Sequence, residues 1–127
     1  MIFVDPPTVT IRKNEYMGLE GREITLECDV VSDPPETAVY WRKIVRGVMS
    51  DVDTTLPKYS RTSPSSPSLT IIDLESSDAG TYQCFAENEV GSGSSEETTL
   101  KILCKLFIIP KGFEEISSFE HSKCRHL

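Results

Sequence analysis

Positive charge is scarce in this 127-residue sequence, which has 13 Lys and Arg residues against 20 Asp and Glu and a formal net charge of −7. Proteins that hold the phosphate backbone of nucleic acids do so with clusters of Lys and Arg that displace counterions. The chain contains no such cluster. We therefore predict that nucleic acid is not its partner.

Long apolar runs are missing too. The apolar start at residues 1–4 ends at Asp5, whereas a signal peptide has about 7–15 apolar residues after a basic start. The apolar stretch at residues 100–109 is interrupted by Lys101 and Lys105, and it is shorter than the roughly 20 residues that span a bilayer. The sequence as given predicts neither a membrane-spanning segment nor a signal peptide, and we interpret the chain as a fragment of a longer protein.

Histidine is absent from residues 1–120, since the only two are His121 and His126. Catalysis by a Ser-His or Cys-His pair needs a base beside the nucleophile. The main part of the chain contains no histidine to act as this base, so such a pair would require the last residues to fold back onto it. The glycines do not form a phosphate-binding loop, and the Asp51-x-Asp53 spacing lacks the rest of a calcium-binding loop. We predict that the protein is not an enzyme and has no cofactor.

Possible metal ligands gather near the end of the chain, where His121, Cys124 and His126 have Cys104 as a distant fourth member. Zinc favours these residue types. The spacing H-x-x-C-x-H is, however, not a common zinc-finger pattern. We interpret the segment as an unstructured tail that happens to contain His and Cys, and we predict no metal site.

The chain before residue 103 consists of short segments in which polar and apolar residues alternate. Alternation with a period of two is typical of a half-buried strand, and no segment there keeps the period of 3.6 that marks a helix. The predicted strands are 8–11, 24–28, 39–42, 48–52, 58–61, 69–74, 80–86 and 98–103, with turns at 19–22 and 91–94. Short strands at intervals of about 8–12 residues indicate an all-β sandwich.

Two cysteines and a tryptophan have an informative spacing. Cys28 and Cys84 are 56 positions apart with Trp41 between them, and Cys84 ends the run Asp-Ala-Gly-Thr-Tyr-Gln-Cys at residues 78–84. This arrangement resembles the immunoglobulin superfamily, which has a Cys on strand B, a Trp on strand C and the signature D-x-G-x-Y-x-C at the start of strand F. The resemblance implies a Greek-key immunoglobulin-like β-sandwich.

The residues after Cys84 indicate which set of immunoglobulin domains the sequence resembles. Residues 84–91 (Cys-Phe-Ala-Glu-Asn-Glu-Val-Gly) are similar to the pattern C-x-A-x-N-x-x-G of the I-set, which builds tandem arrays in adhesion and guidance receptors, hemicentins and muscle proteins. The resemblance covers about residues 5–103, which we expect to form one domain. Residues 104–127 depart from it and are expected to be a poorly ordered or irregular tail.

The resemblance also implies a disulfide bond. Cys28 and Cys84 would join the two sheets, with the indole of Trp41 packed against the bridge. Cys104 and Cys124 lie outside this pair, and we expect them not to form a framework disulfide of the fold.

Four further residues acquire structural roles by the same resemblance. Tyr82 corresponds to the tyrosine corner, whose hydroxyl group returns to the backbone between Leu74 and Asp78. Asp78 is expected to be partly buried beside a cation at the start of strand D. Lys58 matches that place better than Arg61 does.

The outward side chains of strands C, F and G form a candidate protein-binding face. Because Trp41 and Cys84 point inward, their sequence neighbours point outward. The face so defined comprises Tyr40, Arg42, Gln83, Phe85 and Lys101. Aromatic residues and Arg are the types that contribute most to binding energy. The alternatives are that these residues are exposed without a function, or that a neighbouring domain or the tail covers them.

Three functions remain open from the sequence. The favoured one is an extracellular or cell-surface module for adhesion or recognition, with protein partners, a second copy of the chain among the candidates, and neighbouring immunoglobulin domains in a longer chain. Its basis is the Cys28/Cys84 pair, since disulfides persist in oxidising compartments. The alternative is a cytoplasmic structural domain of the muscle-filament type, which the missing signal peptide favours. The third is an immune-type receptor or soluble decoy.

Overall fold

The computed structural model describes residues 5–59 and 65–103, and the predicted tail, with Cys104 and Cys124, lies outside the described residues. Apart from one short 3₁₀ turn, η1 (Ser76–Asp78), the regular elements of this part are strands. They are β1 (Asp5–Ile11), β2 (Glu15–Leu19), β3 (Ile24–Leu26), β4 (Cys28–Asp33), β5 (Ala38–Val45), β6 (Val48–Asp51), β7 (Leu69–Ile71), β8 (Gly80–Glu87), β9 (Ser92–Ser94) and β10 (Thr98–Leu103).

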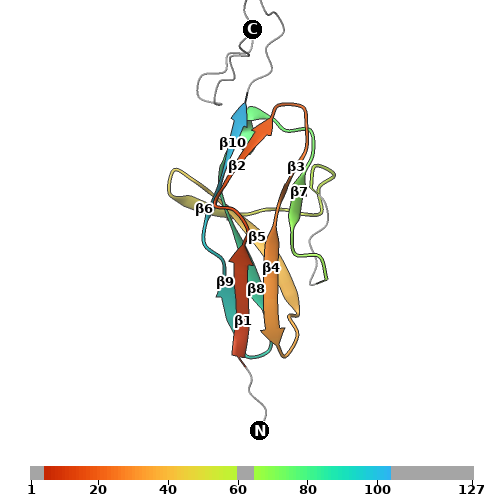
Figure 1. Cartoon of the computed structure of the whole chain (residues 1–127), viewed down its shortest axis with the longest axis vertical. Coiled ribbons are helices and arrows are strands. Elements are labelled where there is room, and N and C mark those ends of the chain that lie inside the picture. Colours follow the sequence, from red (N-terminus) through yellow and green to blue (C-terminus); the bar gives the residue numbers. More distant parts are fainter. Residues whose placement is uncertain (1–4, 60–64, 104–127) are drawn as a thin grey trace, which may run out of the picture.

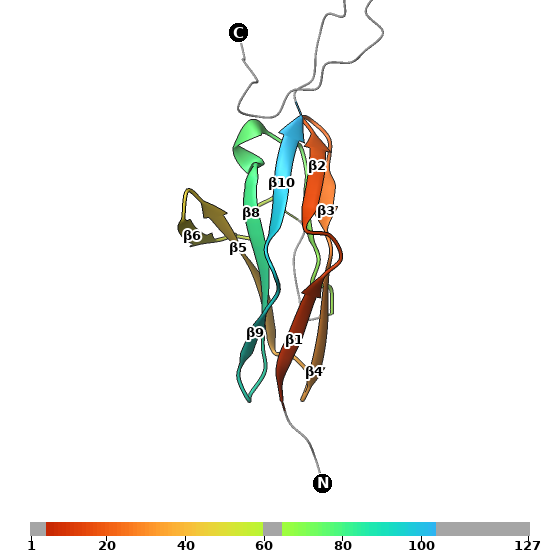
Figure 2. The same cartoon turned by 60° about the vertical axis from the view of Figure 1, so that its left-hand side comes forward.

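The strands pack as two layers of a sandwich (Figure 2). One layer is a six-stranded sheet in the order β2-β10-β8-β5-β6, with β9 beside β8, and the other contains the pairs β1–β4 and β3–β7. The start of β1 and the end of β10 lie at opposite ends of the sandwich (Figure 1). This architecture confirms the predicted all-β immunoglobulin-like sandwich. No helix in the described ranges is long and apolar enough to cross a membrane.

The first part of the chain contributes to both layers. β1 pairs antiparallel with β4 in one layer, and β2 then pairs parallel with β10 in the other. Sequence analysis predicted no strand at β2, and this was wrong. The reason is Gly18, which is buried at a position where an alternating pattern normally shows an apolar side chain. A Cβ atom there would lie 2.6 Å from Cδ1 of Leu74, so a larger residue would require the Leu74 side chain to shift.

The segment predicted as a turn at residues 91–94 is also partly a strand. β9 pairs with β8, and Ser94 stands opposite Phe85. A Cβ atom on Gly93 would lie 2.0 Å from the carbonyl oxygen of Pro7, because β1 passes directly over this strand. Small residues therefore serve close packing here, although the same residues are typical of turns.

Other strand boundaries differ less. The predicted strand 24–28 is divided into β3 and β4, and the predicted strand 69–74 is regular only over β7. In the predicted strand 58–61, Tyr59 forms an isolated bridge with Ile71, and residues 60 and 61 lie outside the described part.

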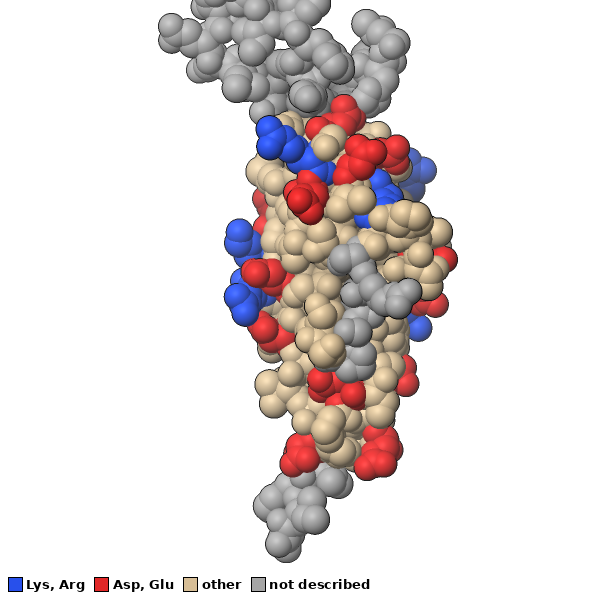
Figure 3. All heavy atoms as spheres, turned by 90° about the vertical axis from the view of Figure 1, so that its right-hand side faces the viewer, with Lys and Arg blue, Asp and Glu red and all other residues tan. Residues whose placement is uncertain are grey.

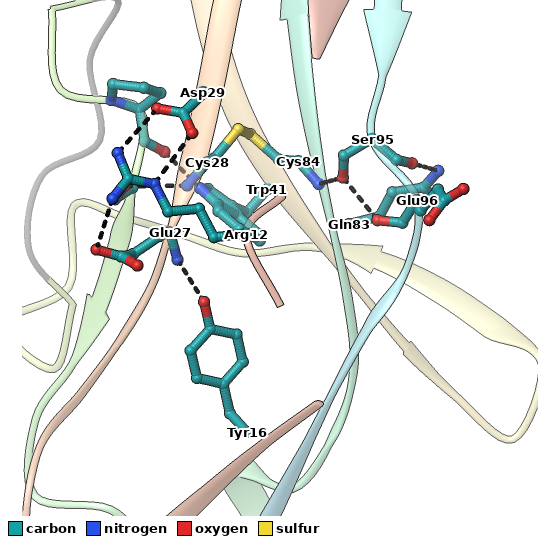
Figure 4. The surroundings of a disulfide bond; sticks show 12 residues. Arg12, Tyr16, Glu27, Cys28, Asp29, Trp41, Gln83, Cys84, Ser95 and Glu96 are labelled. Carbon is teal, nitrogen blue, oxygen red and sulfur yellow. Dashed lines mark hydrogen bonds and ion pairs between the residues drawn. A yellow bond between two sulfur atoms is a disulfide. The ribbon is translucent and has the colours of Figure 1, made fainter. Parts of the chain in front are cut away.

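The core lies between the layers around the Cys28–Cys84 disulfide, whose Cα atoms are 6.6 Å apart. Trp41 is fully buried beside it, and its Nε1 donates a hydrogen bond to the carbonyl oxygen of Pro67 at 2.8 Å. Figure 4 shows the bridge and the indole between the two layers. The other large buried side chains of the core are Leu26, Leu69, Ile71, Leu74, Tyr82, Leu100 and Ile102.

Candidate functional site

The candidate binding face begins with the register of β5 and β8. Trp41 stands opposite Cys84 and both point into the core, so the flanking pairs Tyr40–Phe85 and Arg42–Gln83 project from the outer side of the sheet. Alternation along both strands thus brings two aromatic side chains, 45 residues apart in the chain, directly together.

Tyr40, Phe85 and Arg42 form a compact group, which we call the aromatic cluster. The two rings are stacked with their centroids 5.3 Å apart and their planes 4° from parallel. The guanidinium carbon of Arg42 lies 5.0 Å from the centroid of Phe85 and 5.5 Å from that of Tyr40, within the range of cation–π contacts. Mutual packing leaves both rings half-buried rather than fully exposed.

Contacts with β6 hold Arg42 in this position. Its Nε donates to Oδ1 of Asp51 at 2.9 Å, and its Nη1 lies 3.6 Å from the sulfur of Met49. Burial, with a smaller contribution from the nearby carboxylate of Glu87, raises the pKa of Tyr40. The phenol is therefore neutral at physiological pH. The cluster offers an apolar ring surface bordered by one cation and one anion.

Two residues of the predicted face have other partners. Nε2 of Gln83 donates to the carbonyl oxygen of Ser95 at 2.7 Å, which ties it to the segment between β9 and β10. Lys101 lies on the same side of the sheet but opposite Met17 of β2, with its Nζ 3.7 Å from Glu15. Lys101 therefore belongs to the predicted side of the sheet but does not lie beside the aromatic pair, because the β8–β10 register places it toward the other end.

Sequence analysis missed residues that extend this face toward β6. Ile44 of β5 stands opposite Met49 of β6 on the same side as the aromatic cluster, and Met49 is 44% exposed. The sequence pair Arg46-Gly47 could have located them, because it forms the two-residue turn of the β5–β6 hairpin. Such a turn fixes which residues of the two strands stand opposite each other.

The residues given structural roles meet at the end of the sandwich where β8 begins, the upper end in Figure 2. Nζ of Lys58 lies 2.8 Å from Oδ2 of Asp78, and the hydroxyl group of Tyr82 donates to the carbonyl oxygen of Asp78 at 2.6 Å. Leu74 is buried just before η1, and its backbone N–H donates to the carbonyl oxygen of Arg22 at 2.8 Å. Arg61, the alternative partner of Asp78, lies outside the described residues.

Asn88, the Asn of the pattern C-x-A-x-N-x-x-G, joins three segments at the opposite end, a role that the sequence analysis did not assign to it. Its Oδ1 accepts from the backbone N–H groups of Val90 at 2.8 Å and Gly91 at 3.0 Å. Its Nδ2 donates to the carbonyl oxygen of Asp5, the hydroxyl group of Ser32 and the carbonyl oxygen of Pro34. Such a fully bonded buried amide is a structural element rather than a binding group.

Chemistry other than recognition has little support in the described residues. No group of three or more His, Cys, Asp or Glu side chains there has the arrangement of a metal site. Asp51 is engaged by Arg42, and the carboxylate of Asp53 accepts a hydrogen bond from the backbone N–H of Thr55 at 3.0 Å. The His121, Cys124, His126 and Cys104 set lies outside the described part of the chain.

Comparison with known proteins places the chain among adhesion-type relatives. A family model described as "Immunoglobulin domain" matches residues 6–88. The human protein "Brother of CDO" is 32% identical over 88 residues, which is 69% of this chain and 7% of that protein. Neural cell adhesion molecule 1-A of Xenopus laevis is 33% identical over 90 residues, or 67% of this chain and 8% of that protein. The chain thus spans less than a tenth of these two relatives.

Solved structures share the fold. The N-terminal four immunoglobulin domains of Dscam1 isoform 4.44 match with a TM-score of 0.68 and 24% identity, covering 83% of this chain and 27% of that one. The I-band fragment I67–I69 of titin matches with a TM-score of 0.63 and 24% identity, covering 78% and 33%. At this identity the likeness concerns the fold alone.

Proposed function

This chain belongs to the immunoglobulin domain family, and we propose that it is a protein-recognition module that acts at the cell surface or outside the cell. The observation that carries the proposal is the aromatic cluster, because stacked aromatic rings under an Arg are the kind of anchor on which interface energy concentrates. No described residue of another layer covers this side of the sheet (Figure 2).

Recognition would proceed by packing rather than by chemistry on a ligand. An apolar side chain of the partner would lie against the exposed edges of Tyr40 and Phe85, and Arg42 and Asp51 would supply directional hydrogen bonds at the border. Because Arg42 is already held by Asp51, little side-chain freedom is lost when a partner binds. We propose no catalytic step and no cofactor.

The setting of the module is proposed from three observations. The Cys28–Cys84 bridge suits an oxidising compartment. One of the relatives is named as an adhesion molecule. The opposite positions of the start of β1 and the end of β10 suit a module with neighbouring immunoglobulin domains on both sides (Figure 1).

A cytoplasmic structural domain of the muscle-filament type is the second candidate, and the likeness to the titin fragment is the observation that favours it. The two candidates differ in the state of the cysteines. Mass spectrometry of the protein isolated from its source without reductant is expected to find the Cys28–Cys84 peptide pair. Free thiols at both positions would favour the cytoplasmic candidate. An immune-type receptor is a variant of the first candidate.

The binding face is tested with the full chain fused to a multimerising tag. We expect the multimer to bind intact cells, and Tyr40→Ser/Phe85→Ser to reduce this binding at least about tenfold, as loss of a hot-spot anchor does. The matched control is Val31→Ser/Ile72→Ser, which removes two exposed apolar side chains from outside this face. A folded cluster variant that binds as well as the parent would contradict the proposal.

A further inference from the structure

Among the described strands, the outermost one of the six-stranded sheet, β6, is paired on one side only. It pairs with β5 through the register Arg42–Asp51 to Val45–Val48, and no other strand within residues 5–59 and 65–103 lies on its other side. All four of its residues are exposed, and two of them are large and apolar: Val48 is 68% exposed and Met49 is 44% exposed. An uncovered apolar edge is a template for pairing with another strand.

The hydrogen-bond pattern identifies which backbone groups are available. The N–H of Val52 donates to the carbonyl oxygen of Trp41 at 3.0 Å, so the pair Trp41–Val52 is a hydrogen-bonded pair. Bonded and non-bonded pairs alternate along an antiparallel ladder. The backbone N–H and C=O groups of Met49 and Asp51 therefore face away from β5, and in residues 5–59 and 65–103 they have no hydrogen-bond partner.

The turn before β6 holds this edge in a defined conformation. Arg46 and Gly47 have positive φ values of 52° and 78°, as both central residues of a type I′ turn do. Such turns match the twist of a two-stranded hairpin. Figure 2 shows the β5–β6 hairpin projecting sideways from the sandwich, so its edge is accessible to another molecule.

We propose that β6 docks against β6 of a second copy of this chain, in antiparallel orientation, so that the two six-stranded sheets become continuous. Charge along the edge favours this partner and this orientation. Arg46 stands at one end of the strand, whereas Asp51 and Asp53 stand at the other. Antiparallel pairing places the Arg46 of each copy at the acidic end of its partner, and parallel pairing places like charges together.

The end of the sandwich where β1 begins is less suited to self-association. Asp5 stands opposite Asp33 where β1 begins, and Figure 3 shows acidic groups at this lower end without Lys or Arg beside them. Two copies meeting there would repel each other. The short edge of β6 limits the buried area, so the dimer is weak and forms at high local concentration, as at a crowded surface. The proposal does not rest on the aromatic cluster.

Amide hydrogen exchange of the full 127-residue chain tests the pairing directly. As protein concentration rises, exchange at Met49 and Asp51 is expected to slow, because these N–H groups bond to the second copy. Ser50, whose backbone faces β5, is the internal reference and is expected not to change. Unchanged exchange at Met49 and Asp51 over a concentration range in which sedimentation detects dimers, or no dimers at any concentration, would overturn the proposal.

A charge exchange tests the orientation. Arg46→Asp and Asp53→Arg each place like charges together in an antiparallel homodimer, and each variant alone is expected to dimerise about tenfold more weakly. The double variant Arg46→Asp/Asp53→Arg restores both opposite-charge contacts in an antiparallel homodimer, whereas in a parallel one it keeps like charges together, so it is expected to dimerise as the parent does. A double variant that dimerises no better than the single variants would contradict antiparallel pairing.

Two further variants separate the backbone from the side chain. Met49→Pro removes the edge N–H and is expected to weaken dimerisation about tenfold, whereas Met49→Ala keeps the N–H and is expected to retain most of it. Tyr40→Ser/Phe85→Ser, which disrupts the aromatic cluster, is expected to leave β6 pairing intact. Loss of dimers with that variant and not with Met49→Pro would move self-association to the aromatic cluster.

Discussion

Lys58 and Asp78 form an ion pair at the end of the sandwich where β8 begins, in which Nζ lies 2.8 Å from Oδ2 and the Asp78 side chain is 4% exposed. The same oxygen accepts a hydrogen bond from the backbone N–H of Glu75 at 2.7 Å. The pair therefore fixes the loop before β8 to the segment before β7, and it shields a charge that burial would otherwise make costly.

Removing one partner of this pair is expected to be strongly destabilising. Asp78→Ala leaves the N–H of Glu75 without its acceptor and removes the nearest anion from the Lys58 ammonium group, which keeps the carbonyl oxygen of Asp73 at 3.1 Å. The free energy of unfolding should fall by about 2–3 kcal/mol. Urea unfolding measures this. The control is Glu15→Ala, which breaks the exposed pair with Lys101 and should cost about 0–1 kcal/mol. Equal losses for the two variants would show that burial does not strengthen the Lys58–Asp78 pair.

Stability is expected to fall above about pH 10. Burial raises the pKa of Tyr82 and of Tyr59, and for Lys58 the hydrogen bond to Asp78 and its charge outweigh partial burial and raise the pKa. All three groups hold their protons more tightly in the folded chain, so their contributions are complete below their unfolded pKa values of about 10 and are lost as pH rises above them. Lys43, whose pKa burial lowers, acts in the opposite direction.

The measurement for this pH dependence is the urea midpoint between pH 7 and pH 11. Tyr82 is completely buried, so it should dominate the decline. Tyr82→Phe is expected to be less stable at pH 7, because the hydrogen bond to Asp78 is lost, but to decline less steeply above pH 10. A midpoint that stays constant to pH 11 would contradict the prediction.

Asn88 should be among the most sensitive polar positions. Asn88→Ala deprives the turn after β8 of an acceptor and the start of β1 of a donor, all in a buried setting. We expect the free energy of unfolding to fall by about 2–3 kcal/mol, as when buried groups lose their partners. Glu89→Ala changes the exposed neighbour and should stay within about 0.5 kcal/mol of the parent. Chemical denaturation of both variants compares the two.

Gly93 should not tolerate a methyl group. A Cβ atom there meets the Pro7 carbonyl oxygen at 2.0 Å, and β1 must move away to make room. Gly93→Ala is expected to cost about 1–3 kcal/mol and to speed amide exchange in β1. At Gly91 the nearest atom, Cγ of Pro6, is 3.4 Å from the added Cβ, so Gly91→Ala is the matched control with a smaller effect. A stable Gly93→Ala variant with unchanged exchange would argue against this close approach.

Strands were predictable from the sequence where side chains alternate, and not where glycine replaces them. The pattern around β8 is complete, with Tyr82, Cys84 and Ala86 all inward. β2 and β9 contain Gly18, against which the Leu74 side chain packs, and Gly93, where the backbone of β1 comes too close for a Cβ atom. A glycine that is needed because another segment packs closely against it adds no apolar side chain to the alternating pattern, so the strand is not recognised from the sequence.

The candidate site was predicted in part for a similar reason. Alternation places Tyr40, Phe85 and Arg42 on one side of the sheet, but their stacking depends on the β5–β8 register. Lys101 was assigned to the same group because alternation states which side a residue occupies and not how far along the sheet it lies. The register is set by long-range pairing, which a local pattern does not contain.

The amino-acid sequence by itself determined the sandwich class, the inward residues of the long strands and the spacing of Cys28 and Cys84, because these follow from side-chain period and from a motif of fixed spacing. Tertiary structure alone decided that β2 joins the six-stranded sheet, that Arg42 lies over two stacked rings, and that the outer edge of β6 pairs with no other described strand. Those features depend on the register and order of strands distant in sequence, and these are settled only when the two layers pack around one core.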